Sequence, residues 1–165
     1  MTFMPFVKVK YRTNLPMDDV LKKLDSVIEP KKNTVFGGLS YTKAFSGELF
    51  DDNFIITRNI VYRNSFLPVI KGKIYCENGN TIIEMFLRLH LFVIVFLSIW
   101  LSIPFMLICL VLFNLIVKQT GSLNSIIMPM ILFLFGCFVM IGGFNYENAK
   151  AQNIIKELLE AELIG

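Results

Sequence analysis

Charged side chains are absent from two long stretches of this sequence. No Asp, Glu, Lys or Arg occurs between Arg88 and Lys118, and none occurs between Lys118 and Glu147. Charged residues make up 18% of the chain and hydrophobic residues 55%, whereas an ordinary soluble domain has about 25% and about 45–50%. This composition excludes a disordered chain, a collagen-like chain and an ordinary soluble domain.

Cysteine and histidine are also scarce, with three Cys and one His in 165 residues. Cys109 and Cys137 lie within the uncharged stretches and Cys76 lies in a predicted strand, without a Cys-x-x-Cys pair. A disulfide framework or a structural zinc site needs more of these residues at closer spacing. We therefore expect a reducing compartment, no metal site and no cofactor.

Two apolar segments fill the uncharged stretches and predict a transmembrane helical hairpin at 91–144. The first span, 91–117, has Asn114 as its one strongly polar side chain, and the second span covers 126–144. At about 1.5 Å per residue, segments of this length cross a hydrocarbon core of roughly 30 Å. The connecting residues 118–125 are polar and include a glycine, which favours a short turn.

The distribution of basic residues predicts the orientation of this hairpin. Residues 1–90 contain 13 Lys or Arg, the hairpin loop contains Lys118 alone, and the tail 145–165 contains two. Because Lys and Arg accumulate on the cytoplasmic side, both termini should be cytoplasmic. Residues 1–8 lack the long apolar core of a signal peptide. We expect three side chains to mark the membrane interfaces, namely Arg88, His90 and Lys118.

Outside the hairpin, the periodicities predict one α+β domain. Residues 7–12 alternate apolar and basic side chains as a half-buried strand does, and apolar side chains recur at helical spacing in 17–28. Further alternating segments follow, and a second apolar stripe lies in the tail. We expect domain 1–90 to form an antiparallel sheet of about five to six strands with two packing helices. The second helix, in 145–165, returns to the sheet, so the hairpin interrupts the order β-α-β-strands-α before its last helix.

The clearest hairpin signal is Asn78-Gly79 between two alternating segments, 68–76 and 81–89. Asn-Gly favours a two-residue type I′ turn, and such a turn fixes the register of the two strands. This register places Lys73 opposite Glu84 as an expected ion pair. It gathers the apolar side chains on the other face, namely Ile70, Ile74, Ile83, Met85, Leu87 and Leu89. A less regular hairpin is expected from 45–50 and 54–63.

The order of these elements is similar to the helix-grip layout of small ligand-cradling domains and to pleckstrin-homology-like modules. The likeness is one of topology and involves no residue motif. The segments 62–74 and 81–83, followed by a second span that ends in Gly142-Gly143-Phe144, resemble a group of small uncharacterised bacterial membrane proteins with two transmembrane helices. This resemblance covers most of the chain and implies a multi-pass protein of a bacterial inner membrane, but no activity.

Patterns that carry catalysis are not found. A Ser-His-Asp or Cys-His arrangement would have to use His90, which follows the last predicted strand at the membrane surface. The acidic pairs Asp18-Asp19 and Asp51-Asp52 lie in the first turn of a helix and in a predicted turn, where structural roles explain them. We therefore expect no catalytic residue and a protein that is not an enzyme.

Five basic residues lie on or between neighbouring predicted strands, namely Arg58, Arg63, Lys71, Lys73 and Arg88. Near a membrane such a set can bind phospholipid headgroups or a small anionic ligand, at about 1 kcal/mol per residue. The alternative is a solvated outer sheet face with local ion pairs. Nucleic acid is not an expected partner, because the net charge is only +4 in residues 1–90 and −2 in the tail.

Small residues in the spans are the expected sites of helix packing, namely Ser98, Ser102 and Gly136. The two serines are four residues apart and therefore share one face of the first span. Their contact is either within the hairpin or between copies of the chain, so the pattern leaves a homo-oligomer open.

These observations favour a non-enzymatic, two-span protein of a bacterial inner membrane. We expect its membrane-proximal cytoplasmic domain to bind a protein partner or a small anionic ligand and to act as a regulatory module beside the lipid bilayer. Two alternatives stay open. One is an effector or immunity component of a toxin or phage-defence system that acts at the membrane. The other is a membrane-attached lipid-handling enzyme, which would need His90 or a carboxylate in a cavity.

Overall fold

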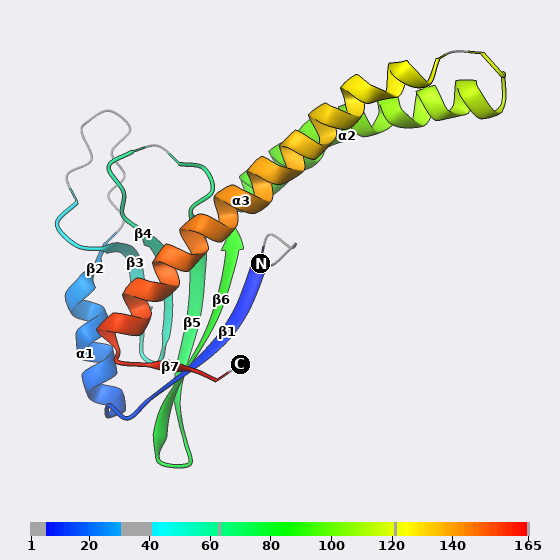
Figure 1. Cartoon of the computed structure of the whole chain (residues 1–165). Coiled ribbons are helices and arrows are strands. Elements are labelled where there is room, and N and C mark those ends of the chain that lie inside the picture. The colour runs from blue at the N-terminus through cyan, green and yellow to red at the C-terminus, as the bar shows by residue number, and fades with distance from the viewer. Residues whose placement is uncertain (1–5, 31–40, 63, 121, 165) are drawn as a thin grey trace.

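The computed structural model describes residues 6–30, 41–62, 64–120 and 122–164. Within them the chain forms a mixed α+β structure with a seven-stranded sheet and three α-helices, which confirms the predicted fold class (Figure 1). The elements follow in the order β1 (Phe6–Thr13), α1 (Met17–Val27), β2 (Ile28–Glu29), β3 (Phe45–Phe50), β4 (Asn53–Arg58), β5 (Pro68–Glu77), β6 (Asn80–Leu89), α2 (Leu91–Ile116), a 3₁₀ turn (Leu123–Ile126), α3 (Ile127–Leu158) and β7 (Glu162–Leu163).

The sheet has the strand order β2-β3-β4-β5-β6-β1-β7. The pairing is antiparallel except between β2 and β3, which are parallel. The count exceeds the expected five to six because two strands of two residues each, β2 and β7, extend the edges. Such short strands depend on a neighbouring edge for their hydrogen bonds, so the local sequence carries no signal for them.

The register predicted for the β5–β6 hairpin is confirmed, since Lys73 lies opposite Glu84 and Val69 lies opposite Arg88. The expected ion pair between Lys73 and Glu84 is wrong. Glu84 instead pairs with two lysines of β1, at 2.5 Å from Lys8 and 3.4 Å from Lys10. These contacts arise because β1 flanks β6 on its other side and presents both lysines on the same face.

The strand expected over 54–63 ends earlier, at Arg58. At Asn59 the backbone N–H still donates to the Ala44 carbonyl at 2.8 Å, and the side-chain amide nitrogen donates to the Lys43 carbonyl and to Glu29, both at 2.9 Å. Its side-chain oxygen also accepts from the Ser46 hydroxyl at 2.6 Å. The described residues between Arg58 and the start of β5, namely 59–62 and 64–67, lie outside the strands, and we call them the β4–β5 loop.

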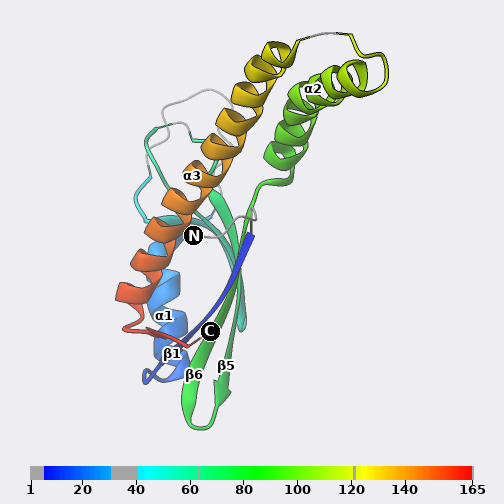
Figure 2. The same ribbon diagram turned by 45° about the vertical axis from the view of Figure 1, so that its right-hand side comes forward.

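One face of the sheet is buried by α1 and by the C-terminal half of α3, which lie side by side on it (Figures 1 and 2). The core between these layers contains side chains from every long strand and from both helices, including Tyr11, Leu24, Phe45, Phe54, Ile56, Ile70, Ile74, Ile83, Met85, Leu87, Ala151 and Ile155. The opposite face is open and carries the charged side chains that alternate with the buried ones along β1, β5 and β6.

The second apolar span and the closing helix are one continuous helix, α3, of 32 residues. We expected the span 126–144 and the closing helix in 145–165 to be separate elements, whereas the structure has one helix across both. At about 1.5 Å per residue, a helix of this length extends about 48 Å, which exceeds the roughly 30 Å of a hydrocarbon core. The same helix therefore carries an apolar segment and, without a break, the segment that packs on the sheet.

Helices α2 and α3 form a hairpin that extends away from the sheet, while β1 and β7, the first and last strands, belong to the sheet (Figure 1). Both helices are long and apolar enough to cross a membrane, with a mean hydropathy of 2.7 and 2.4 in their most apolar segments. Only 6% of each segment is buried within the protein, whereas the core helix of a soluble domain would be mostly buried. This arrangement is compatible with a two-span membrane protein.

Candidate functional site

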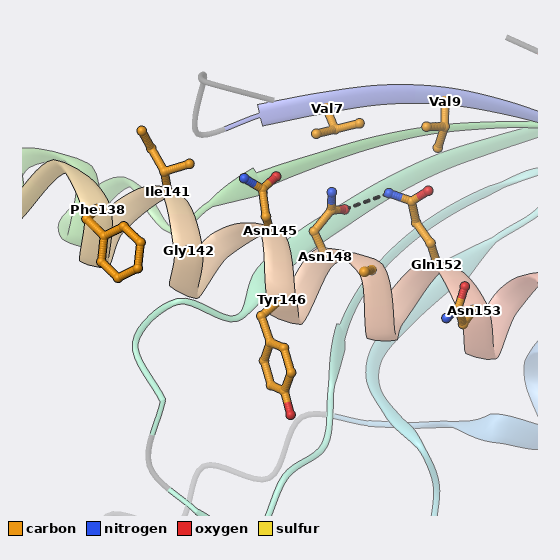
Figure 3. A pocket seen from close by; sticks show the side chains of 11 residues that line it. Val7, Val9, Phe138, Ile141, Gly142, Asn145, Tyr146, Asn148, Gln152 and Asn153 are labelled. Atoms are coloured by element: carbon orange, nitrogen blue, oxygen red, sulfur yellow. Dashed lines mark hydrogen bonds between the residues drawn. The ribbon is translucent and has the colours of Figure 1, made fainter. Parts of the chain in front are cut away.

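A groove lies between β1, which forms an edge of the sheet through most of its length, and helix α3 (Figure 3). Its volume is about 810 Å³. The residues that line it include an apolar group, Val7, Val9, Phe138, Ile141, Gly142 and Ala149, and a polar group, Asn145, Tyr146, Asn148, Gln152 and Asn153. We call it the β1–α3 groove. Phe138, Ile141 and Gly142 of the apolar group lie in the last turns of the uncharged part of α3. The polar group begins at Asn145, further along the same helix.

Two successive hydrogen bonds hold the polar side chains of this groove in place. The Tyr11 hydroxyl donates to Oε1 of Gln152 at 2.8 Å. Nε2 of Gln152 donates in turn to Oδ1 of Asn148 at 2.9 Å (Figure 3). Burial raises the pKa of Tyr11, so this hydroxyl keeps its proton and stays a donor. These two hydrogen bonds fix the orientation of the Asn148 amide. Its oxygen faces Gln152, and its nitrogen faces Val7 across the groove.

A second polar site lies on the same helix, where the carboxylate of Glu147 is fully buried at 0% exposure. It forms an ion pair with the Arg58 guanidinium. The Tyr62 hydroxyl and the Asn64 amide nitrogen both donate to its Oε1, at 2.9 Å and 2.8 Å. We call these four residues the Glu147 cluster. It joins the end of β4 and the β4–β5 loop to α3.

The cluster keeps the carboxylate ionised despite its burial. Desolvation alone would raise the pKa of Glu147, but the hydrogen bonds from Tyr62 and Arg58 and the charge of Arg58 outweigh it, so the pKa is lowered. Desolvation likewise opposes the charge of Arg58, and the bonds to Tyr62 and Glu147 reverse the effect and raise its pKa. With three donors on one carboxylate, Glu147 is suited to fixing the loop on the helix rather than to exchanging protons.

Phe66 makes a further contact between the same loop and α3. Its ring lies directly on Gly143, where an added Cβ would come within 2.9 Å of the ring atoms. The Asn64 side chain, which also bonds to Glu147, accepts from the Phe66 backbone N–H at 2.9 Å. The β4–β5 loop therefore holds α3 at two successive turns, at the point where its apolar part ends.

The basic residues expected to bind anions do not all lie together. Arg58 points to the inner side of the sheet and belongs to the Glu147 cluster. Lys71, Lys73 and Arg88 are exposed on the outer face of the sheet, and Lys8 and Lys10 of β1 lie on the same face. We call these five residues the outer basic face. Arg63 lies outside the described residues.

The residues expected at the membrane interfaces occupy both ends of α2. Arg88 is the second-last residue of β6, just before the helix. His90 is the N-cap of α2, and its Nδ1 accepts from the Phe92 backbone N–H at 3.3 Å. Lys118 is exposed just after the end of α2, at the far end of the hairpin.

The three small residues of the spans have different surroundings. Gly136 is buried against α2, where an added Cβ would lie 2.5 Å from the Trp100 ring and 2.7 Å from the Leu101 side chain. Ser98 and Ser102 are exposed, and their hydroxyls donate to backbone carbonyls of their own helix. Gly136 therefore packs within the hairpin, and the two serines do not.

Neither the Glu147 cluster nor the β1–α3 groove was predicted from the sequence. One signal for the cluster was present, because Glu147 lies three residues after Phe144 and four before Ala151, both buried. This spacing places an acid in the middle of a buried helical stripe, and a buried acid requires a partner. Nothing in the sequence identifies that partner as Arg58, which is 89 positions away.

No group of three or more His, Cys, Asp or Glu side chains that could hold a metal ion occurs in the described part of the chain. In comparisons with known proteins, no family, no curated protein and no solved structure matches this chain. The resemblance to small bacterial two-span proteins therefore stays a prediction.

Proposed function

We propose that this chain is a non-enzymatic, two-span protein of a bacterial inner membrane whose cytoplasmic domain is a binding and regulatory module. Its ligand would occupy the β1–α3 groove. Both termini and the sheet lie on the cytoplasmic side in this proposal, in line with the excess of basic residues in 1–90.

One observation carries the proposal, namely that a single unbroken helix contains both an apolar segment long enough to span a bilayer and the polar wall of the groove. A ligand that contacts this wall also contacts the helix that forms half of the hairpin. Because α3 is unbroken from its apolar segment to the groove wall, a displacement of that wall also displaces the hairpin. Binding in the groove can thus change the position of the hairpin, which is the basis for a regulatory role.

The outer basic face supports a location close to an anionic leaflet. In the described residues, neither Lys71, Lys73 nor Arg88 forms an ion pair with a carboxylate. In Figure 2, α1 lies on one side of the sheet and the hairpin leans toward the other, which is the side of the outer basic face. With the hairpin in a bilayer, this lean turns the face toward the headgroups, where each free Lys or Arg contributes about 1 kcal/mol.

Native mass spectrometry of the full-length protein, extracted in a mild detergent, tests this function. Gly142 lines the groove and has no atom within 4 Å of an added Cβ, so Gly142→Leu should place its side chain in the groove and fill it. We expect a bound species in the wild type that is lost in Gly142→Leu. The matched control, Val139→Leu, adds bulk at an exposed position outside the groove lining and should retain the species.

Three results would contradict the proposed function. The first is a bound species that Gly142→Leu leaves unchanged, and the second is no bound species in any of the three proteins. The third is full-length protein that stays in the supernatant without detergent after high-speed centrifugation, since a two-span protein must sediment with the membranes.

A further inference from the structure

Resting on the proposed function, we infer that the ligand of the β1–α3 groove is an uncharged glycerolipid of the diacylglycerol class, with one acyl chain in the apolar part and its ester and hydroxyl oxygens at Asn148. The groove volume of about 810 Å³ lies within the range of roughly 300–1,000 Å³ that is usual for small-molecule sites. The chemical nature of its two ends identifies the ligand class.

The apolar end of the groove is reached from the bilayer. Phe138, Ile141 and Gly142 line it on α3 and belong to the uncharged segment of that helix, while Val7 and Val9 line it on β1. Gly142 leaves open space where any other residue would place a side chain. An acyl chain can therefore enter sideways from the leaflet and keep an apolar surface on both sides, without passing through water.

The polar end presents a hydrogen-bond donor. Asn148 is 6% exposed, and its Oδ1 is already used by Gln152 at 2.9 Å. Its amide nitrogen points across the groove toward Val7 (Figure 3), and it donates no hydrogen bond to any described residue. An amide donor on the wall of this groove gains from an acceptor oxygen there, and the ester carbonyl or free hydroxyl of a glycerolipid supplies one directly next to the acyl chain.

The charge of the lining selects against anionic lipids. No Lys, Arg, Asp or Glu is among the described residues that line the groove. The nearest basic residue on α3, Lys150, lies over the Tyr146 ring at 4.1 Å, and Tyr146 points away from β1 (Figure 3). A phosphate placed beside Asn148 would lose its hydration without a counter-charge. The basic residues that could hold a phosphate lie on the other face of the sheet.

Photo-crosslinking of the full-length protein in nanodiscs tests this inference. Two probes carry the same diazirine-bearing acyl chain, and one has a diacylglycerol head while the other has a phosphatidic acid head. After irradiation, peptide mapping should place the diacylglycerol probe on peptides that contain Phe138–Asn153 and Val7–Val9, with labelling at least about fivefold above that of the phosphatidic acid probe.

Two variants separate the contributions of the polar and apolar ends of the groove to lipid binding. Asn148→Asp keeps the size of the side chain and the acceptor for Gln152 but removes both N–H donors, so diacylglycerol labelling should fall about tenfold. Gly142→Leu should abolish labelling by both probes, and Val139→Leu should leave it unchanged. Circular dichroism melting curves like that of the wild type verify that each variant is folded.

The outcomes distinguish the lipid class from the function. Equal or stronger groove labelling by the phosphatidic acid probe overturns the lipid class and leaves the proposed function in place. A species that native mass spectrometry finds bound, and that is not a glycerolipid, does the same. Labelling that appears only in a chain without residues 2–5 makes the N-terminal segment the occupant and overturns the inference. Absence of groove labelling together with absence of any bound species overturns both proposals.

Discussion

The buried pair Arg58–Glu147 should be the polar interaction on which the domain depends most. The exposed fraction of the side chain is 12% for Arg58 and 0% for Glu147. Removing one partner of a buried ion pair costs about 3–5 kcal/mol, because the other charge stays buried without compensation. In Arg58→Met the aliphatic bulk is kept, and Glu147 retains only the neutral donors Tyr62 and Asn64. We expect a loss of about 3 kcal/mol or more.

The double variant Arg58→Met/Glu147→Met should lose less than the single variant Arg58→Met. Replacing both charges by apolar groups of similar size is often neutral. The Nε atom of Arg58 is buried and has no hydrogen-bond partner in the described structure, so the native pair itself is incompletely satisfied. The coupling energy of this double-mutant cycle should reach about 2 kcal/mol.

The contribution of Glu147 to stability should depend on pH with opposite sign in the wild type and in Arg58→Met. In the wild type the folded pKa of Glu147 is lowered, so its contribution is present above the unfolded value of about 4.3 and is lost as the pH falls through the folded pKa. In Arg58→Met, desolvation should dominate and raise the folded pKa above the unfolded value. The penalty of this variant is then largest at neutral pH and shrinks as the pH falls.

Hydrogen exchange of the backbone amides of β5 and β6, measured by mass spectrometry on the full-length protein in nanodiscs, reports this stability. Because about 1.4 kcal/mol corresponds to a factor of ten, Arg58→Met should exchange roughly 100-fold faster or more at pH 7. Arg88→Met, the same substitution at an exposed position without an ion pair, is the control and should change stability by less than about 0.5 kcal/mol. The reasoning would be refuted if Arg58→Met and Arg88→Met exchanged at equal rates. It would also be refuted if the double variant Arg58→Met/Glu147→Met were no more stable than Arg58→Met.

Further predictions concern the hairpin and its orientation. Gly136→Ala should shift the fluorescence of Trp100, the one tryptophan of the chain, because the added Cβ would lie 2.5 Å from its ring, at a cost of about 1–3 kcal/mol. Gly142→Ala, with no atom within 4 Å, should leave the fluorescence unchanged, and an equal shift in both variants would count against the packing described. Cys76 is exposed on the sheet domain, so with the two span cysteines replaced by alanine it should react with a membrane-impermeant maleimide in inverted vesicles only. Asn124→Cys, in the connection between the helices and in a chain whose three native cysteines are all replaced by alanine, should show the reverse, and the opposite pattern would reverse the proposed orientation.

The features that could be predicted from the sequence are those that nearby residues determine. Asn78-Gly79 fixes a two-residue turn, and the turn fixes every pair between β5 and β6. The apolar helices could be recognised because their length without a charge is itself the signal, and α2 runs over Leu91–Ile116 where the span 91–117 was expected.

The features that could not be predicted depend on contacts between distant segments. The polar residues around Glu147 suggest the end of a span, yet the helix continues because Arg58, Tyr62 and Asn64 satisfy the carboxylate. The pairing of Glu84 with β1 requires knowledge of which strand lies beside β6. The β1–α3 groove likewise exists only because the closing helix lies next to a strand from the start of the chain.

The central claim is that α3 carries the chain from the bilayer into the domain and that the β1–α3 groove lies across this boundary. Electron paramagnetic resonance in nanodiscs tests it most directly, with single spin labels at positions 138, 145 and 153 and with oxygen and a nickel chelate as relaxation agents. We predict that the label at Phe138 contacts oxygen and lipid, that the label at Asn153 contacts the nickel chelate in water, and that the boundary lies near Asn145. A label at Phe138 accessible to the chelate, or a label at Asn153 at hydrocarbon depth, would contradict the account.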